Sequence, residues 1–213
     1  MTFINNKLIL ATHNEGKISE FKQLLSFTDL EISSAAEYYL EEPEETGMSF
    51  EENAAIKALY VAEKTGKVAL SDDSGLCIEA LNGAPGIYTS NWAESESGQR
   101  DFTMAMEKIE HKLREVSAIS PKDRQASFIS VLCLAWPDGK KLFFKGEVKG
   151  EIIWPPRGEL GFGLDPIFLP EGEKRTFGEM SSIEKHSWRP GAVSALSHRA
   201  KAFKQFTEKL FFS

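Results

Sequence analysis

Two adjacent aspartates, Asp72 and Asp73, follow a short apolar run and precede Ser74 and Gly75. Adjacent carboxylates repel each other, so such a pair is expected on a solvated turn or where a cation neutralises it. Mg²⁺ binds a few carboxylates and completes its coordination with water and phosphate oxygens. If a strand ends here and the chain turns at Ser74 and Gly75, both carboxylates would lie at the strand end where α/β sheets bind ligands. The stretch is compatible with a metal-assisted phosphate site and with an ordinary solvated turn.

The stretch THNEGK, residues 12–17, has the composition of an anion-binding turn. An apolar strand pattern ends before it and a helix pattern follows, so backbone N–H groups at the helix start could hold an anion, with Lys17 adding a charge. The stretch is not a Walker A loop, because the glycines and the terminal Ser/Thr of that motif are missing. A turn capped by Asn14 explains the same residues without a ligand.

Acidic residues are concentrated before and at the start of the next predicted helix. They are Glu41, Glu42, Glu44, Glu45, Glu51 and Glu52. Lys57 lies four residues after Asn53 and shares its helix face. A face with carboxylate, amide and ammonium groups suits a site for a cation and a phosphate, and it suits any exposed helix as well.

A glycine-rich loop and a basic helix start lie in the second half of the chain. In GELGFGLDPIF, residues 158–168, three glycines surround Phe162. Glycine lets the backbone approach a flat ligand and an aromatic ring can stack on it, although the loop could also enclose a core phenylalanine. His198 and Arg199 can donate hydrogen bonds to carbonyl oxygens, while Ser197 can serve as a helix cap.

The elements that would position these residues alternate along the chain. Helical spacing of apolar residues predicts helices over 12–25, 50–66, 100–116 and 195–212. Ser49 and Glu52 occupy capping-box positions before the second of these helices, and Gly66 is expected to end it. Short apolar runs predict strands over 7–11, 30–34 and 67–71, and strand patterns over 125–136 and 140–152 flank a turn at 137–139. In the last helix, Phe203, Phe206 and Leu210 are expected to face inward. Alternating strands and helices with one long hairpin predict an α/β fold with a mixed sheet.

Composition limits the classes of function. The 213 residues with 41% apolar content can form a substantial core, and the net charge of −7 disfavours binding to a nucleic acid polymer. Cys77 and Cys133 lie in apolar runs and fit no metal motif, so we expect reduced core thiols. The apolar run at 7–11 is too short for a signal peptide or a membrane span, so we expect a cytoplasmic protein with no membrane partner.

Taken together, the chemical stretches resemble a known family. THNEGK, SFEENAAIKA, SDDSGL, GAPGIYTSNWA, GFGLDPIF, FGEM and SHRAKAF occur in this order between residue 8 and about residue 206. The set resembles the inosine triphosphate pyrophosphatases, or XTP/dITP diphosphatases. The resemblance implies a single domain over 1–213 with an elongated mixed sheet, flanking helices and two lobes around a deep central cleft, and it implies a homodimer. It also implies Mg²⁺-dependent hydrolysis of ITP, dITP and XTP to the monophosphate and pyrophosphate, which removes aberrant nucleotides.

The resemblance implies roles for individual residues. Asp73 matches the catalytic aspartate and a metal ligand, and a second metal ligand matches Glu44 or Glu45, between which the sequence does not choose. The residues expected to contact substrate are Thr12, His13, Asn14, Glu15, Gly16, Lys17, Lys57, Ser74, Phe162, Gly163, Leu164, Asp165, Lys185, His198 and Arg199.

These roles suggest a mechanism. Mg²⁺ would offset the repulsion between the paired aspartates, and Asp73 would orient or deprotonate a metal-bound water for attack at the α-phosphorus. Lys17 and Lys57 would spread the charge of the leaving pyrophosphate. Donors such as the backbone of the 162–165 loop, His198 and Arg199 would bond the 6-keto oxygen of a deaminated purine and oppose the amino group of adenine.

The sequence departs from the family pattern in two places. Leu164 replaces a usual tyrosine, and twelve residues separate Lys185 from His198 where the family commonly has about four. We expect 186–193 to form an exposed loop at the cleft mouth, with Trp188 covering apolar surface. In an alternative, the insertion displaces Lys185 from the site and Arg189 supplies the positive charge. Alternatives for the function are a pyrophosphatase for pyrimidine or modified nucleotides and a nucleotide-binding protein without catalysis.

Overall fold

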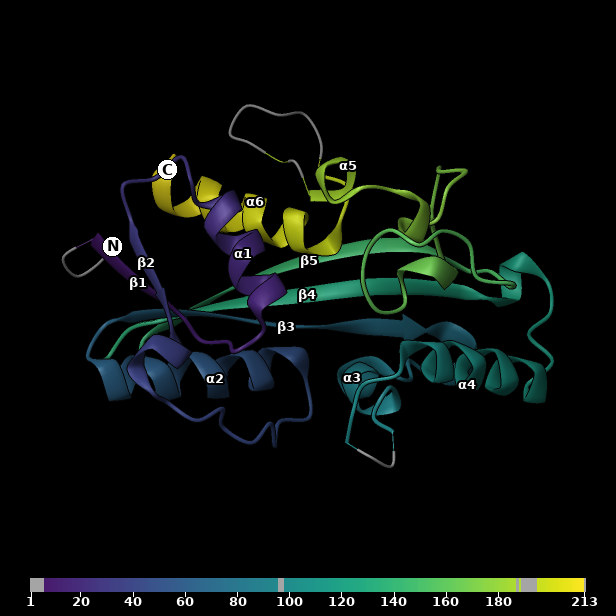
Figure 1. Ribbon diagram of the computed structural model, residues 1–213, viewed down its shortest axis with the longest axis horizontal. Coiled ribbons are helices and arrows are strands. Elements are labelled where there is room, and N and C mark those ends of the chain that lie inside the picture. The colour runs from purple at the N-terminus through teal and green to yellow at the C-terminus, as the bar shows by residue number, and fades with distance from the viewer. Residues whose placement is uncertain (1–5, 96–97, 187, 189–194, 213) are drawn as a thin grey trace.

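The computed structural model describes residues 6–95, 98–186, 188 and 195–212, and its centre is one six-stranded sheet (Figure 1). In sheet order the strands are β2 (Glu31–Ser34), β1 (Lys7–Leu10), β3 (Val68–Ile78), β4 (Gln125–Ala135), β5 (Lys141–Ile152) and β6 (Phe168–Pro170). The first three run parallel, and β3 to β6 pair antiparallel. The sheet is therefore mixed, as the sequence predicts.

Six α-helices flank the sheet among the described residues. They are α1 (Glu15–Leu24), α2 (Phe50–Thr65), α3 (Thr89–Trp92), α4 (Phe102–Glu115), α5 (Ser182–His186) and α6 (His198–Phe211). The predicted caps are confirmed: the side chain of Asn14 accepts a hydrogen bond from the backbone N–H of Lys17, and that of Ser49 accepts one from Glu52. Gly66 ends α2 in the left-handed conformation, which glycine adopts without strain.

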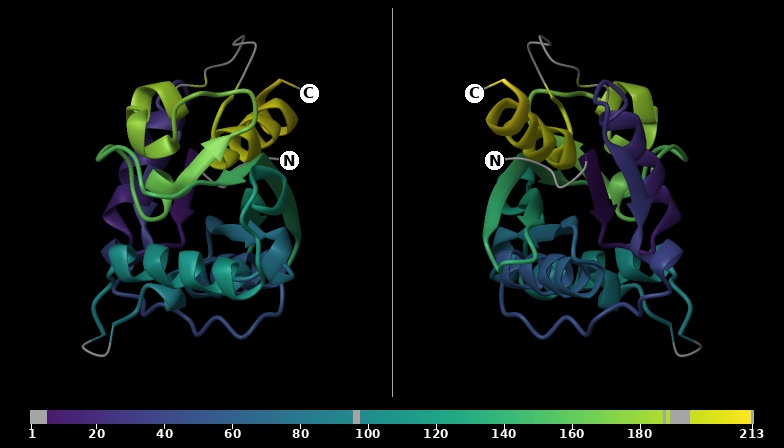
Figure 2. Two further views of the ribbon diagram at one scale, coloured as in Figure 1. Left: turned by 90° about the vertical axis from the view of Figure 1, so that its right-hand side faces the viewer. Right: turned by 90° about the vertical axis from the view of Figure 1, so that its left-hand side faces the viewer.

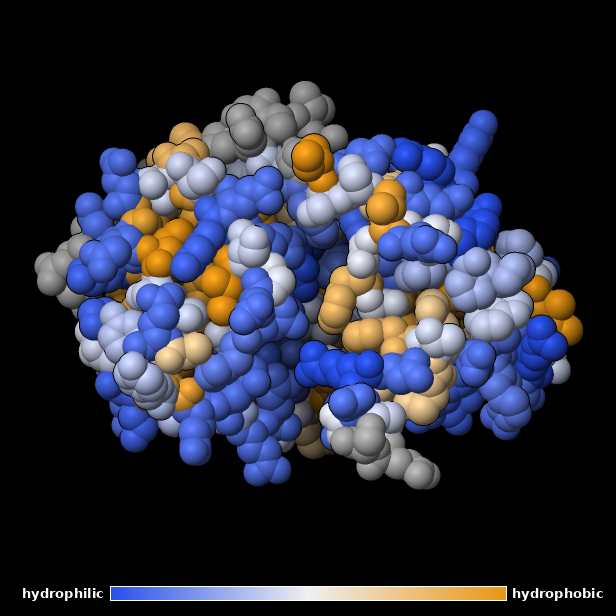
Figure 3. Space-filling model, viewed as in Figure 1, coloured by the Kyte–Doolittle hydropathy of each residue, from blue (hydrophilic) through white to orange (hydrophobic). Residues whose placement is uncertain are grey.

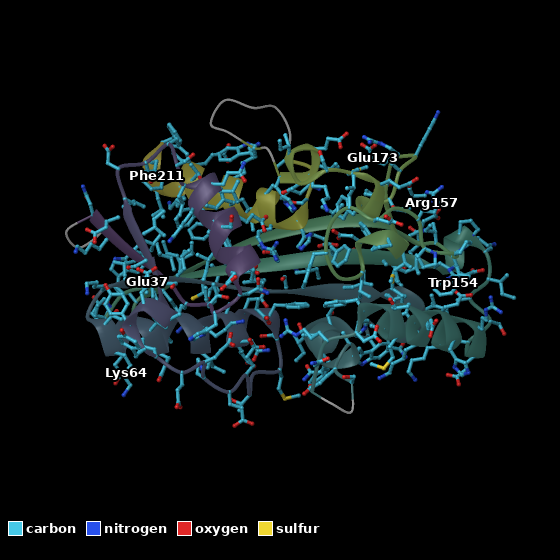
Figure 4. All side chains as sticks on the ribbon, in the orientation of Figure 1. Glu37, Lys64, Trp154, Arg157, Glu173 and Phe211 are labelled. Carbon is cyan, nitrogen blue, oxygen red and sulfur yellow. The ribbon has the colours of Figure 1, made fainter. Side chains whose placement is uncertain are left out.

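The helices cover the sheet differently along its length. Near β1 and β2, α2 packs on one face while α1 and α6 pack on the other, so this half has two cores (Figures 1 and 2). In one of these cores Phe203 and Phe206 of α6 are fully buried and Leu210 packs against them, as predicted. The other half has its own core around α4 and the ends of β3, β4 and β5. Lys64 and Phe211 lie toward one end of the molecule and Trp154 and Arg157 toward the other (Figure 4).

The strand that carries the aspartates is longer than the sequence predicts. The strand predicted over 67–71 is confirmed, but its predicted end and the turn at Ser74 and Gly75 are wrong, because β3 continues to Ile78 and pairs with β4 from Ala69 to Ile78. The ladder with β4 satisfies the backbone of this polar segment and keeps it extended. Gly75 is needed for packing rather than for a turn, since a Cβ there would clash with the carbonyl oxygen of Gly86.

Two other sequence-based expectations concern thiols and membranes. Cys133 is buried, Cys77 is partly buried, and both are free, which agrees with the predicted thiols. None of the described helices has the length and apolar character that a membrane-spanning segment needs.

Candidate active site

Asp72 and Asp73 lie in the middle of β3 and face opposite sides of the sheet, because successive residues of a strand alternate. Asp72 faces α1 and α6, where its Oδ2 lies 2.8 Å from Lys17 Nζ. Asp73 faces α2, where its Oδ1 lies 3.4 Å from Lys57 Nζ. Each carboxylate has a cation of its own, which corrects the expectation that Mg²⁺ is needed to offset their repulsion.

Asp72 is a fully paired buried carboxylate. Its side chain has no exposed area, and its oxygens accept hydrogen bonds from Ser130 Oγ at 2.6 Å and from Arg199 Nη2 at 3.3 Å. Burial alone would raise the pKa of Asp72, but Lys17 and Arg199 outweigh this and hold the pKa well below its usual range. Asp72 therefore stays ionised and joins α1, β4 and α6 to β3.

Asp73 is nearly as buried but is poorly satisfied. Its Oδ2 has no hydrogen-bond partner among the described residues. Burial raises the pKa of Asp73 to about 6; Lys57 opposes the rise, and the nearby carboxylates Glu45 and Asp72 add to it. An incompletely paired carboxylate with this pKa can accept a proton near neutral pH, and its free oxygen can bind a cation.

Lys57 connects Asp73 to the acidic segment before α2. Its Nζ lies 2.6 Å from Glu45 Oε1, and its side chain is buried in the sheet-facing side of α2. The backbone N–H of Gly47 donates to Asn53 Oδ1 at 2.8 Å, so the first turn of α2 holds this segment in place. Both candidate metal ligands are at exposed positions, and of the two Glu45 reaches the Asp73 site through its contact with Lys57.

The THNEGK turn follows the carboxyl end of β1, which is a switch point of the sheet. From β1 the chain passes through α1 to β2, which lies on one side of β1 in the sheet. It then passes through α2 to β3, which lies on the other side of β1. Asn14 N donates to Thr12 Oγ1 at 3.1 Å, and His13 Nε2 lies 2.7 Å from the Leu40 carbonyl oxygen. Glu15 and Gly16 open α1, and Lys17 extends from its first turn to Asp72.

The glycine-rich loop belongs to the other half of the molecule. Phe162 is 65% exposed and packs edge-to-face against Phe102 of α4 with ring centroids 5.0 Å apart. Asp165 Oδ2 accepts hydrogen bonds from Phe162 N at 2.9 Å and Lys185 Nζ at 2.8 Å, which orders the loop around Gly163. The side chain of Leu164, by contrast, is buried in the core.

The insertion leaves Lys185 beside the glycine-rich loop. The backbone N–H of Ser197 donates to the Lys185 carbonyl oxygen at 3.0 Å, which joins the two ends of the inserted segment. Trp188 is 4% exposed and packs on Phe203, so it covers apolar surface but is not part of an exposed turn as expected. Arg189 and the rest of 189–193 lie outside the described residues.

His198 and Arg199 begin α6 on the face shared with Asp72. His198 stacks on Phe128 with ring centroids 5.0 Å apart, and burial holds its pKa well below the usual range, so the ring is neutral. Arg199 Nη1 contacts Glu20 Oε2 at 2.8 Å, and Nη2 contacts Asp72 and Ser74 Oγ at 3.3 and 3.2 Å. The guanidinium is thus held by three side chains.

The space-filling view shows a hollow near the middle of this face (Figure 3). In the ribbon view from the same side, α1 and α2 lie on one side of that place and α3 and the 158–165 loop on the other (Figure 1). Cations and carboxylates lie on the β1 side, and an exposed aromatic ring lies on the loop. Such an arrangement can hold charged phosphates at one side and a flat apolar group at the other.

A family model described as the Ham1 family matches residues 8–209. The chain belongs to the Ham1 family. It is 60% identical over 203 residues to a protein of Brucella melitensis, covering 95% of this chain and 92% of the relative, and 56% identical to one of Mesorhizobium japonicum, covering 97% and 94%. Both relatives are named dITP/XTP pyrophosphatase. The solved structure of a HAM1 protein from Coxiella burnetii is 34% identical, with a TM-score of 0.86 over 97% of this chain and 99% of that one.

Membership of the Ham1 family confirms the resemblance drawn from the sequence motifs, and the Ham1 structure confirms the mixed sheet with flanking helices. The structure also identifies side chains that the motifs did not include. Glu20 and Ser130 contact Arg199 and Asp72, and Phe102 supports Phe162. Of these side chains, only Glu20 could have been found from the local sequence, because it lies three residues after Lys17 on the same face of α1.

Proposed function

We propose that this protein hydrolyses deaminated purine nucleoside triphosphates, namely ITP, dITP and XTP, to the nucleoside monophosphate and pyrophosphate. The observation that carries the proposal is the buried, incompletely paired carboxylate of Asp73 beside Lys57, across β3 from the Lys17 turn. The names of the curated relatives, at 50–60% identity, support the same reaction class.

Asp73 and Glu45 fit a divalent cation, which we propose is Mg²⁺. The unpartnered Oδ2 of Asp73 and the partly exposed carboxylate of Glu45 are hard oxygen ligands. Two protein carboxylates would leave coordination positions on the ion for phosphate oxygens and water. The bound ion would polarise the phosphate and make water more acidic.

The chain's own residues then have distinct tasks. Asp73 accepts the proton of the attacking water, because its carboxylate lies beside Lys57 with one oxygen that has no hydrogen-bond partner among the described residues. Lys57 and Lys17 approach from opposite faces of β3 and stabilise the negative charge that develops on the leaving pyrophosphate. A triphosphate would compete with Asp72 for Lys17, since the two anions need the same ammonium group.

The base would bind at the glycine-rich loop. Phe162 offers an exposed ring for stacking, and the loop backbone and Lys185 are donors for a 6-keto oxygen. Adenine places an amino group there, and leaving buried donors unpaired costs about 1–3 kcal/mol for each mismatch. Arg199 is better explained as a residue that organises the phosphate side, because its contacts are with Asp72, Glu20 and Ser74.

The decisive experiment is hydrolysis of dITP with Mg²⁺ in H₂¹⁸O. Attack at the α-phosphorus places the heavy oxygen in dIMP and none in pyrophosphate. Release of dIDP and orthophosphate, or label in pyrophosphate, contradicts the proposal. ATP and a panel of pyrimidine and modified triphosphates test the substrate class, and calorimetry that detects dITP binding without turnover would instead indicate a nucleotide-binding protein.

Three further proposals concern the whole molecule. We infer one domain with two lobes, because β3, β4 and β5 contribute residues to the cores of both halves. A homodimer follows from the family resemblance and is checked by light scattering during gel filtration. A cytoplasmic location and the lack of nucleic acid polymer partners remain predictions from the sequence.

A further inference from the structure

The outer edge of β5 has no partner strand over most of its length. β5 pairs with β4 on one side, and on its other side the described part of the chain pairs it with β6 at Gly150–Ile152. Next to β6, the backbone N–H of Glu171 donates to the Lys149 carbonyl oxygen at 2.9 Å, and no described strand continues this pairing toward Lys141. A free edge of this kind can pair with a strand of another chain.

A cavity of about 670 Å³ lies beside this edge. β5 contributes Glu147 and Lys149 to its lining, the chain at the end of β6 contributes Glu171, and α6 contributes Lys201. The cavity therefore lies where a strand in line with β6 would continue along β5. Space for a further strand is available next to the free edge, and Lys201 stands at its border.

Two side chains of α6 form hydrogen bonds to the free edge. Lys201 Nζ donates to the Glu147 carbonyl oxygen at 2.9 Å, and Gln205 Nε2 donates to the Lys145 carbonyl oxygen at 2.8 Å. Residues two apart in a strand direct their backbone groups to the same side, so both carbonyl groups point away from β4. Lys201 and Gln205 are four residues apart on one face of α6, which matches this spacing.

A glycine of β5 lets α6 come close enough for these bonds. A Cβ at Gly146 would clash with the carbonyl oxygen of His198 and the backbone nitrogen of Ala202. The helix backbone therefore rests directly on the strand, and α6 lies along β5 in the ribbon view (Figure 1). Because the helix is fixed at this distance, its side chains can reach past the strand to the outer carbonyl groups.

The side chains along the free edge are complementary to a second copy of the same edge. Lys145 is exposed and Glu147 is partly exposed on one face of β5, and Phe143 on that face is 40% exposed. If two such edges pair antiparallel with Lys145 of each copy opposite Glu147 of the other, two opposite-charge pairs form. Each such pair contributes about 0.2–1 kcal/mol. A second copy of this chain is therefore the partner that the uncovered edge fits.

We propose that Lys201 and Gln205 keep the free edge of β5 closed to a second copy of this chain. They occupy the carbonyl groups that an added strand would need as acceptors, and the side chain of Lys201 would have to leave the edge before a strand could enter. Without them, edge-to-edge pairing would join the sheets of two molecules. This device concerns the edge of the sheet and not the candidate active site, so it does not rest on the proposed function.

The test is the double variant Lys201→Ala/Gln205→Ala, compared with the native protein over a range of concentrations. In light scattering during gel filtration, the native protein should keep one mass, and the double variant should form species of about twice that mass as its concentration rises. Hydrogen exchange should show that the amides of 143–147 become protected in these species. Lys204→Ala, which removes a positive charge of α6 that pairs with Glu208, is the matched control and should behave as the native protein.

A third substitution tests the pairing itself. Lys145→Glu in the double variant places like charges opposite each other in the paired edges, so the larger species should be lost. Circular dichroism checks that each variant is folded, and if the double variant does not fold, Lys201→Ala and Gln205→Ala are measured singly with the same expectation. A native mass at every concentration, protection confined to residues outside 143–147, or larger species that persist with Lys145→Glu overturns the proposal.

Discussion

The two faces of β3 present the same residue type in opposite states. On the α1/α6 face, Asp72 is paired with two cations and two hydroxyl groups, and its pKa lies well below the usual range. On the α2 face, Asp73 has one cation, a second carboxylate nearby and an oxygen without a partner, and its pKa is about 6. One carboxylate is satisfied by the fold, and the other needs a ligand.

This difference shows how one strand can combine stability and reactivity. Alternation along a strand places neighbouring side chains in separate environments that other elements supply. A fully paired buried charge contributes to the folded state, and removing its counterpart is costly. An incompletely paired one destabilises the folded state and is available for chemistry. Substituting each aspartate in turn therefore tests the comparison directly.

The largest effect is expected from Asp73→Asn. The amide cannot accept a proton and binds a cation poorly, so kcat for dITP should fall about a thousandfold or more. The fold should persist, and circular dichroism checks this. Asp138→Asn, at the exposed hairpin turn, is the control. A variant that keeps more than about a tenth of the native kcat excludes the proposed base.

The second effect concerns stability. Asp72→Asn leaves Lys17 and Arg199 without their shared carboxylate, so we expect the free energy of unfolding at pH 7.5 to fall by about 2–4 kcal/mol. Urea unfolding measures it. Because the folded pKa of Asp72 is depressed, its contribution is present above the unfolded pKa and is lost as pH falls through the folded pKa. A loss below about 0.5 kcal/mol, typical of surface substitutions, would remove the distinction between the two faces.

The third effect is a gain in stability, opposite in sign to the loss expected for Asp72→Asn. The folded pKa of Asp73 is raised from 3.8 to about 6, so the folded state binds the extra proton between these values and its stability falls as pH rises through this window. Asp73→Asn should therefore be more stable than the native protein by about 1–3 kcal/mol at pH 7.5 without metal, and the difference should shrink toward pH 4. Equal stability at both pH values speaks against the raised pKa.

The smallest effect concerns the Mg²⁺ requirement of variants at the two glutamates before α2, Glu44 and Glu45. Glu45→Gln should raise the Mg²⁺ concentration at half-maximal activity about tenfold, which corresponds to about 1.4 kcal/mol, because Glu45 lies at the Asp73 site. Glu44→Gln, at an exposed position, should stay within about twofold. Metal titrations of both variants decide the matter, and the reverse order would assign the ligand to Glu44.

Local patterns predicted much of the fold because they act over a few residues. The caps at Asn14, Ser49 and Gly66 are satisfied within one helical turn, and the 137–139 turn joins two strands directly. The length of β3 was not predictable in this way. Its partner β4 lies far along the chain, and Gly75 looked like a turn residue although it makes room for the Gly86 carbonyl.

The sequence predicted which residues belong to the candidate site, but it did not predict which side chains contact one another. Motif matching identified Lys17, Asp73 and Lys57, which the structure brings to β3. It did not assign the two aspartates to opposite faces, because that depends on the extended conformation of β3. It did not include Glu20, whose partner Arg199 is 179 residues away in the chain.

That separation has a consequence for biosynthesis. Arg199 begins the final helix, and it contacts Glu20 and Asp72 across 179 and 127 residues of sequence. Domains tend to fold from the N-terminal side as they leave the ribosome. A nascent chain can build β1, α1 and β3 early, but Asp72 and Glu20 have Arg199 as a shared cation only after the start of α6 has been made. Completion of the phosphate side therefore depends on α6, and a chain truncated before α6 would leave two carboxylates without this cation in a state that chaperones and proteases can recognise.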